Sequence, residues 1–591
     1  MLASYCKTAA LASLCLPGVS ARFLGPMDPA PVEISSKDSI VRATWENITS
    51  RFDQHFSGNE HSTLLAGLNK HTFSLGVFST HDTEAAASLQ YHHTGPDVKN
   101  ASNGVNTVNG DSIYRVASLS KLFTVFAGLI ELKPQDWNLP LAEIFPEIAE
   151  LPTDGPIRHV DWHAVTPLGL ASQISGVPRD GKPFDTGDLW YTLLGLTGEP
   201  PVDPATLGFP PLSIEEVEAS VPCKGYNCSG VDYIKGLQGP TFLPWQTPGY
   251  ADTGFILLGQ AIARLTNMTI EEYYRKAVLD PLGMSKTTAI TPTEQGFPGY
   301  VVVAPLEGFA VQGGITSASG GVFSTTNDLA KLGVGILNST LLPADQTRKW
   351  MKPSTFTAHP DFAQGMGWEI YRYTHRDTGH VTDLYTKLGD AGSYSSYLVL
   401  MPDYDVGFSV IQASGIADAA ARSAATQLLA DIVSEAILPA LQNQAAVESK
   451  RNFAGTYTDG QNSSLVLAYN ETASNGAGLT LVSLTSGGHD MMAQVTAQLG
   501  GAQLVLQPAI AASGPARQLS FQATPVVDPA AEGAATGLFS KQFAVNSDWI
   551  INNVATYGGQ GLGTFIFDVS AQGEATAVTP AFLRKAYRRQ D

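Results

Sequence analysis

Apolar residues change their spacing several times along the chain, and each spacing predicts a different element. Residues 34–57 carry them three and four positions apart, which predicts a helix with one buried face. Residues 72–79 and 86–92 look like two strands, the first rich in β-branched and aromatic side chains. From Ser118 to Leu132 nearly every position is apolar, so we expect a helix that is buried on all sides.

The middle of the chain alternates helical stretches with loops rich in Pro and Gly. Helices are expected after Asp252 and after Asp328, strands at 394–401 and 406–413, and a long helix at 416–441. The order is helix and strands, a helical middle, then strands and a final helix. It predicts a mixed α/β or α+β domain over residues 34–441, whose sheet joins distant parts of the sequence.

The pattern changes again after residue 441. Residues 442–451 are polar and predict a linker. Residues 452–591 contain short alternating strands, as at 465–469 and 479–482. They predict a separate all-β domain, either a barrel or a sandwich.

The N-terminus has the features of a secretory signal peptide over residues 1–21. Lys7 precedes an apolar stretch that ends in small residues at 19–21; the alternative is a buried N-terminal helix. No later segment reaches the ~18 apolar residues of a membrane span. We therefore expect a secreted protein, and seven glycosylation sequons agree with export: Asn47, Asn100, Asn227, Asn267, Asn338, Asn462 and Asn470.

Composition narrows the class of protein. The 591 residues are 43% hydrophobic, so a large core can form, and only 15% are charged. The net charge of −19 argues against nucleic acid and acidic membranes as partners. Cys223 and Cys228 lie five positions apart, and in an oxidising compartment we expect them to form a disulfide. No metal ligands lie nearby, and no metal or organic cofactor is expected.

Ser118 and Lys121 are the first residues that could carry chemistry. At helical spacing they share one face, with Ser118 at the helix start, where free N–H groups favour negative charge. Lys121 lies among Leu and Phe, and burial lowers a lysine pKa toward that of a base. The segment 118–121 fits a Ser-x-x-Lys nucleophile pattern, but it fits an ordinary N-cap serine equally well.

Two further segments add polar groups. Tyr250 follows a Pro-Gly turn and could relay a proton, while Asp252 also suits a helix N-cap. Lys387 and Gly389 lie on an expected strand. A strand lysine often only protects a sheet edge. Gly389, however, would allow close backbone approach by a ligand.

These three motifs occur in the order and rough spacing of serine β-lactamase-like and penicillin-recognising proteins, and the chain resembles their class C and esterase branch most. Four flanking segments also resemble that branch: 172–178, 281–284, 320–330 and 365–368. The resemblance covers about residues 35–440, and many fungal relatives carry a C-terminal β domain. It implies an antiparallel sheet flanked by helices, with a helical subdomain.

The resemblance also implies roles. Ser118 would be the acyl nucleophile and Lys121 its activator. Tyr250 would be the base in acylation and the acid toward the leaving group, with positive charge from Lys387 nearby. The N–H groups of Ser118 and Asp390 would form the oxyanion hole, and the partner would be a small-molecule acyl substrate.

Two departures bear on mechanism and substrate. The family usually has Asn or Ser where Asp252 stands, and the added negative charge would favour a protonated Lys121 that leaves base duty to Tyr250. Leu388 replaces the Thr or Ser whose hydroxyl binds the carboxylate side of penicillins. We therefore expect a serine esterase acting on an apolar acyl group. An acyltransferase of secondary metabolism, a β-lactamase or D-amino-acid peptidase, and a catalytically silent binding protein stay open.

Overall fold

The computed structural model describes residues 25–590 with gaps. The gaps are 152–154, 181–192, 194–199, 215, 217–228, 230–232, 235–238, 304–305, 311–312, 472–476, 500–502, 513–516, 527–536, 538 and 540–553. The expected signal peptide and Cys223, Asn227 and Cys228 lie outside the described residues. Of the other sequons, five are exposed and Asn470 is half-buried.

The chain divides into two compact units. One comprises Val32–Arg372 and Asp383–Leu441, and the other comprises the residues up to Pro31, Tyr373–Thr382 and Gln442–Asp591. The linker expected at 442–451 is wrong, because these residues form the last part of the helix α17 (Ala419–Phe453). The segment is polar, but Ala, Gln, Glu and Lys are all strong helix formers.

An eight-stranded sheet organises the first unit. Its order is β2-β1-β10-β9-β8-β7-β6-β5, with bounds Gln90–His93, Thr72–Ser79, Val406–Ala413, Tyr394–Met401, Val381–Ala391, Glu369–Thr374, Phe362–Gln364 and Thr355–Phe356. β1 pairs antiparallel with β10, from Thr72 opposite Ala413 to Ser79 opposite Val406. The sheet thus joins distant parts of the chain, as predicted. The strand expected at 86–92 is partly wrong, because α2 (Ala85–Ser88) precedes β2.

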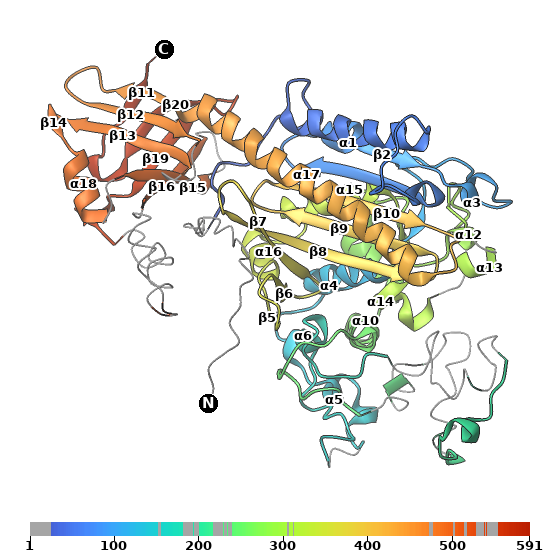
Figure 1. The fold of residues 1–591 in the computed structure, drawn as a ribbon. Coiled ribbons are helices and arrows are strands. Elements are labelled where there is room, and N and C mark those ends of the chain that lie inside the picture. Colours follow the sequence, from blue (N-terminus) through green and yellow to red (C-terminus); the bar gives the residue numbers. More distant parts are fainter. Residues whose placement is uncertain are drawn as a thin grey trace, which may run out of the picture. The chain divides into compact units, whose positions relative to one another are not determined.

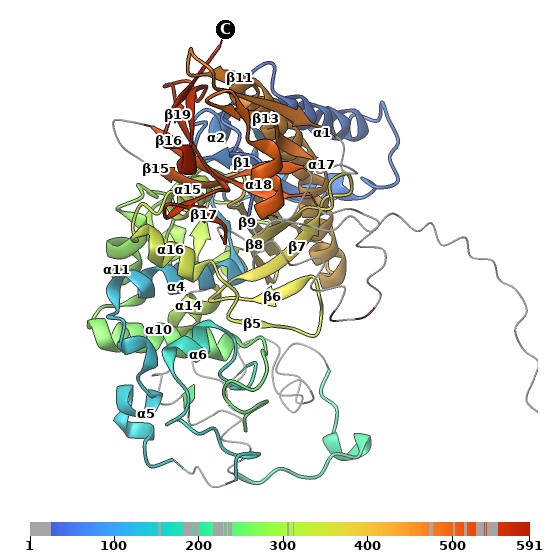
Figure 2. The ribbon, with the colours of Figure 1, turned by 90° about the vertical axis from the view of Figure 1, so that its left-hand side faces the viewer.

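Helices cover both faces of this sheet (Figures 1 and 2). On one face lie α1 (Ile40–Phe56) and α17, and on the other lie α4 (Ser120–Glu131), α14 (Ser317–Gly320) and α15 (Thr326–Leu337). Successive side chains of a strand point to opposite faces. Leu398 and Leu400 of β9 accordingly join the large apolar core that contains α4, whereas the neighbouring Tyr397 lies near Asp431 of α17.

Among the helices that the structure describes, α17 has a length and an apolar composition that would also suit a membrane span. Its buried residues include Leu429, Val433, Ile437 and Leu441, each four positions apart. This spacing is typical of a helix with one face in a protein core.

The second unit contains a closed antiparallel barrel. Eight strands follow the order β12-β11-β21-β20-β19-β16-β15-β13, and a pairing of β12 with β13 closes the ring. Their bounds are Ser464–Asn470, Gly455–Thr458, Tyr587–Arg589, Ala575–Pro580, Thr564–Val569, Gln518–Pro525, Leu504–Ala512 and Gly478–Ser486. β14 (His489–Asp490) pairs antiparallel with the end of β13, and α18 (Met492–Leu499) packs Val495 and Leu499 into the barrel core. Of the two predicted architectures, the barrel is the one present.

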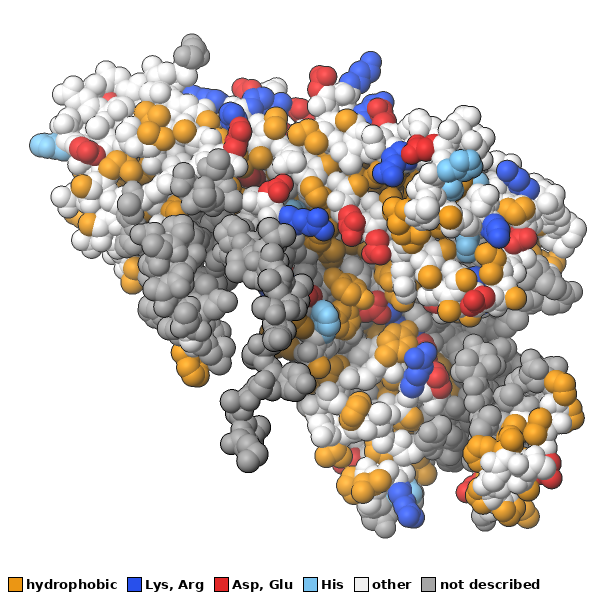
Figure 3. Space-filling model, viewed as in Figure 1, with side chains coloured by type: hydrophobic (Ala, Val, Ile, Leu, Met, Phe, Trp, Pro, Cys, Tyr) orange, Lys and Arg blue, Asp and Glu red, His pale blue; other side chains and the backbone are white. Residues whose placement is uncertain are grey.

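Charged side chains are mixed in sign over one face of the surface. On the face shown in Figure 3, Lys and Arg side chains lie interspersed with Asp and Glu rather than gathered in one patch.

Candidate active site

A strained turn presents Ser118. Residues Ala117–Leu119 form a three-ten turn that leads into α4, and Ala117 has a φ of 46°. A positive φ is uncommon for alanine and marks a backbone held in place by its surroundings. Val116 fixes the turn, because its N–H donates to the carbonyl of Val322 and its carbonyl accepts from the Ser396 hydroxyl. Ser118 does not cap α4, because the N-cap position of this helix is Leu119.

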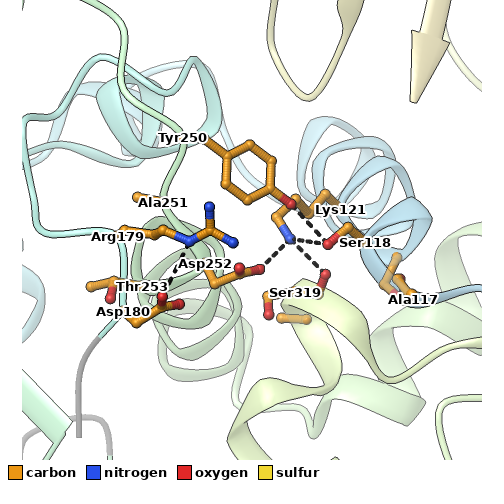
Figure 4. A network of polar contacts seen from close by, with 12 residues as sticks. Ala117, Ser118, Lys121, Arg179, Asp180, Tyr250, Ala251, Asp252, Thr253 and Ser319 are labelled. Atoms are coloured by element: carbon orange, nitrogen blue, oxygen red, sulfur yellow. Dashed lines mark hydrogen bonds and ion pairs between the residues drawn. The ribbon is translucent and has the colours of Figure 1, made fainter. Parts of the chain in front are cut away.

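Lys121 lies one turn into the apolar helix, with 0% of its surface exposed. Its Nζ lies 2.9 Å from Ser118 Oγ, 2.5 Å from Asp252 Oδ1 and 2.8 Å from the carbonyl oxygen of Ser319 (Figure 4). The i, i+3 spacing brings the amine to the serine, and two distant segments supply its other partners.

The three contacts of Lys121 suit both of its protonation states. The Asp252 carboxylate and the Ser319 carbonyl can only accept hydrogen bonds. A charged Lys121 donates its third N–H to Ser118, whereas a neutral Lys121 can accept the Ser118 hydroxyl proton on its lone pair. Burial lowers the pKa of Lys121, while the charge and hydrogen bond of Asp252 oppose that shift. The net direction favours a base.

Tyr250 approaches the same serine oxygen from the other side. Its hydroxyl donates to Ser118 Oγ at 2.8 Å, and its ring lies 5.0 Å from Nζ of Lys121 and 5.2 Å from Nζ of Lys387. Although 37% of the residue is exposed, its hydroxyl end lies among these groups. Burial raises the pKa of Tyr250 to about 12, against the opposing charge of Lys387. The phenol is therefore protonated at neutral pH.

Gln173 holds the turn that carries Tyr250. Its backbone carbonyl accepts from the N–H of Gly249, and its side-chain Oε1 accepts from the N–H of Ala251 at 2.8 Å. Gln173 is buried and has a φ of 58°, a second positive value beside the site. Gln173 thus binds the residues on both sides of Tyr250, one through its backbone carbonyl and the other through its side chain.

Asp252 begins α10 (Asp252–Thr266) but does not cap it. The N-cap position belongs to Ala251, and no side chain caps this helix. Instead the carboxylate reaches Lys121, with a quarter of its side chain exposed. A negative group in the first turn also suits the helix dipole.

Lys387 has a carboxylate partner of its own. Its Nζ lies 2.5 Å from Glu369 Oε1, and it also donates to the carbonyl of Leu388. The second oxygen of Glu369 accepts from the N–H of Leu388 at 2.9 Å. Lys387 is 2% exposed, so it is not a solvent-facing edge lysine.

Gly389 allows β8 to approach the nucleophile turn. A Cβ at this position would lie 2.1 Å from the carbonyl oxygen of Val116 and 3.0 Å from the amide nitrogen of Leu119. The next residue, Asp390, is exposed, and its carboxylate accepts from Ser395. The close approach brings the backbone of β8 beside the start of α4, where the oxyanion hole is expected.

The structure thus brings together six predicted residues: Ser118, Lys121, Tyr250, Asp252, Lys387 and Gly389. Sequence reasoning missed the parts played by Ser319, Glu369 and Gln173. Ser319 acts through its backbone carbonyl, so its identity carries no signal. Glu369 directly follows the 365–368 segment, and a charged residue entering a strand there was the available signal. Among the described residues, no group of His, Cys, Asp or Glu is arranged to hold a metal.

Comparison with known proteins agrees with this geometry. Residues 75–431, more than half of the chain, match the family model described as Beta-lactamase. The chain belongs to the Beta-lactamase family. Residues 445–591 match a second model, described as Beta-lactamase-like-like, C-terminal domain. The first unit therefore has the β-lactamase and transpeptidase type of fold, as predicted.

Curated relatives match most of the chain. A Beta-lactamase-like protein of Arthroderma benhamiae is 28% identical over 83% of this chain and 79% of its own length. A probable hydrolase of Phoma sp. is 24% identical over 73% of this chain and 67% of its own. Among solved structures, D-amino acid amidase from Ochrobactrum anthropi covers 67% of this chain and 98% of its own at 18% identity and a TM-score of 0.45. The family match shows the β-lactamase fold, and the relatives named as probable hydrolases support a hydrolase.

Proposed function

We propose that the chain is a secreted serine esterase that forms an acyl-enzyme on Ser118 with a small-molecule acyl substrate. One observation carries the proposal: Ser118 Oγ lies 2.9 Å from the buried amine of Lys121 and 2.8 Å from the Tyr250 hydroxyl. An otherwise weak nucleophile needs an adjacent base, and a leaving group needs an adjacent acid. Both groups are within hydrogen-bond reach of the one serine oxygen.

In the proposed first step, Ser118 Oγ attacks the carbonyl carbon of the ester and its proton passes to neutral Lys121. Asp252 stabilises the ammonium that forms. The N–H groups of Ser118 and Asp390 take up the negative charge on the carbonyl oxygen. Tyr250 then protonates the departing alkoxide. This assignment reverses the expected use of Tyr250 as the base, because a pKa of about 12 keeps it protonated.

In the second step water attacks the acyl carbon. Its proton passes to the Tyr250 oxygen, and Ser118 leaves with the proton that Lys121 held. An acid is released and the starting protonation states return. An alcohol in place of water would give the acyltransferase reaction with the same groups.

Two features support an ester of an apolar acid. Leu388 offers no hydroxyl to a substrate carboxylate. The segment before Tyr250 exposes Phe242, Leu243 and Trp245 by 36%, 50% and 50%. Its backbone is bound to the Gln173 loop, because Trp245 N–H donates to the carbonyl of Ile174. The Phe242 ring lies against Gly249, the residue before Tyr250, and so offers an apolar surface close to the proposed acid.

Export belongs to the same proposal. The signal peptide at 1–21 and the exposed sequons support a secreted glycoprotein. A Cys223–Cys228 disulfide would form in that compartment. Mass spectrometry of the protein secreted by a fungal host would report the mature N-terminus, the glycans and the disulfide together.

The deciding experiment measures hydrolysis of p-nitrophenyl esters of graded chain length beside the chromogenic β-lactam nitrocefin. Wild type should cleave esters, Ser118→Ala should not, and a serine-reactive fluorophosphonate should label wild type alone. Ser50→Ala, an exposed serine on α1, is the matched control and should behave as wild type. Efficient nitrocefin hydrolysis would make the protein a β-lactamase, and ester turnover that survives Ser118→Ala would end the proposal.

A further inference from the structure

The positive charge of Lys387 is compensated before any substrate arrives. Glu369, the first residue of β7, lies 2.5 Å from its Nζ, and only 14% of the glutamate side chain is exposed. A carboxylate this close to a buried ammonium offsets most of its attraction for a further anion.

Glu369 is also held by its second oxygen. Oε2 accepts from the backbone N–H of Leu388 while Oε1 accepts from Lys387. Two bonds to adjacent residues of β8 fix the carboxylate in one orientation. A substrate carboxylate beside Lys387 would have to displace both bonds or lie next to a second negative charge.

Two other basic side chains of the site also lie beside carboxylates, one of them on the surface. Lys121 lies 2.5 Å from Asp252, and Arg179, whose guanidinium lies 5.4 Å from the Tyr250 ring centroid, is 3.2 Å from Asp180. Each of the three basic side chains that the structure describes around Tyr250 therefore lies beside a carboxylate, and while Lys121 is neutral the charge of Asp252 is not offset at all. Within the described residues around Ser118, an anionic substrate therefore meets no net positive charge.

We propose that Glu369 is a specificity-determining residue, which makes the site select acyl substrates that carry no carboxylate beside the scissile bond. The inference rests on the proposed esterase function. It adds a repulsive element to the missing hydroxyl at Leu388, and discrimination between similar substrates often depends on such elements.

The test uses two esters that differ in one group, 3-carbamoylphenyl butanoate and 3-carboxyphenyl butanoate. Wild type should have a kcat/KM about 10-fold or more higher for the neutral amide-bearing ester. Glu369→Gln keeps the side-chain shape and removes the charge, so this ratio should fall about 10-fold. Asp383→Asn is the matched control, because Asp383 also forms an ion pair between β8 and β7, with Arg372 at 3.1 Å. It should leave the ratio unchanged.

The outcomes separate the two ideas. If neither ester is cleaved in a Ser118-dependent way, the proposed function fails. If both are cleaved but the Glu369→Gln ratio stays within twofold of wild type, the inference fails alone. A second measurement needs no variant: 3-carboxyphenylboronate should bind wild type more weakly than 3-carbamoylphenylboronate. Equal or tighter binding of the carboxylate would overturn the inference even if Glu369→Gln does not fold.

Discussion

Replacing Asp252 with Asn tests how the site controls the proton of Lys121. The substitution keeps an oxygen that can accept the Lys121 N–H and removes only the charge. At 2.5 Å and an effective dielectric constant of about 20, Coulomb's law gives about 6–7 kcal/mol for the pair. Breaking a buried pair usually costs about 3–5 kcal/mol. Because a quarter of the Asp252 side chain is exposed, we take about 3 kcal/mol, or roughly 100-fold in the protonation equilibrium.

The expected result is a shift in the pH dependence of kcat/KM. Lys121 must be neutral to accept the Ser118 proton, so activity rises as pH rises through its pKa. Without Asp252 the ammonium is less stable and that pKa falls further, so the acidic limb should move to lower pH by about two pH units. The plateau rate should also fall, because a weaker base draws the proton less strongly.

Stability provides a second readout with its own sign. Burial already lowers the pKa of Lys121 below its ordinary value, so between the folded and unfolded pKa values the unfolded chain binds more protons than the folded chain. The free energy of unfolding therefore rises with pH in that window, and Asp252→Asn should widen the window toward lower pH. Denaturant titrations at several pH values measure this.

Asp345→Asn is a suitable control, since Asp345 also lies in the first turn of a helix, α16 (Ala344–Trp350), and pairs with a lysine on the surface. If the acidic limb stays in place while the alkaline limb moves to lower pH, Lys121 acts in its charged form and Tyr250 is the base. If neither limb moves, Asp252 does not control the reaction.

Three other substitutions test the framework of the site and the barrel. Gln173→Ala leaves the buried N–H of Ala251 without its acceptor, at a cost of about 1–3 kcal/mol in the free energy of unfolding. It should lower kcat about 10- to 100-fold, because Tyr250 is no longer held in place. A lowered Tm with unchanged kcat would show that Gln173 contributes to folding alone. Gly389→Ala places a Cβ 2.1 Å from the carbonyl of Val116 and should abolish fluorophosphonate labelling, so labelling at the wild-type rate would contradict the close approach. Phe567→Ala removes a fully buried ring from the barrel and should lower the free energy of unfolding by about 3–5 kcal/mol. Denaturant titrations measure this loss, and a loss below about 1 kcal/mol would show a poorly packed core.

Local pattern was sufficient for the elements that form within a few residues. The strands at 72–79, 394–401 and 406–413 have the predicted bounds, because alternation and turn residues are local signals. The pairing of Ser118 with Lys121 was equally local, since helical spacing places them together. The helix at 442–453 was missed because polar residues alone do not distinguish a linker from a solvent-facing helix.

The sequence by itself determined the type of most segments, the order of the three motifs and the family to which they belong. The resemblance already suggested that Asp252 lies near Lys121, but only the tertiary structure gave their direct contact and the pairing of Glu369 with Lys387 across two strands. It also decided the pKa directions of Lys121 and Tyr250, since burial and partners set them. Such interactions depend on distances between residues remote in sequence, and these exist only once the core has packed.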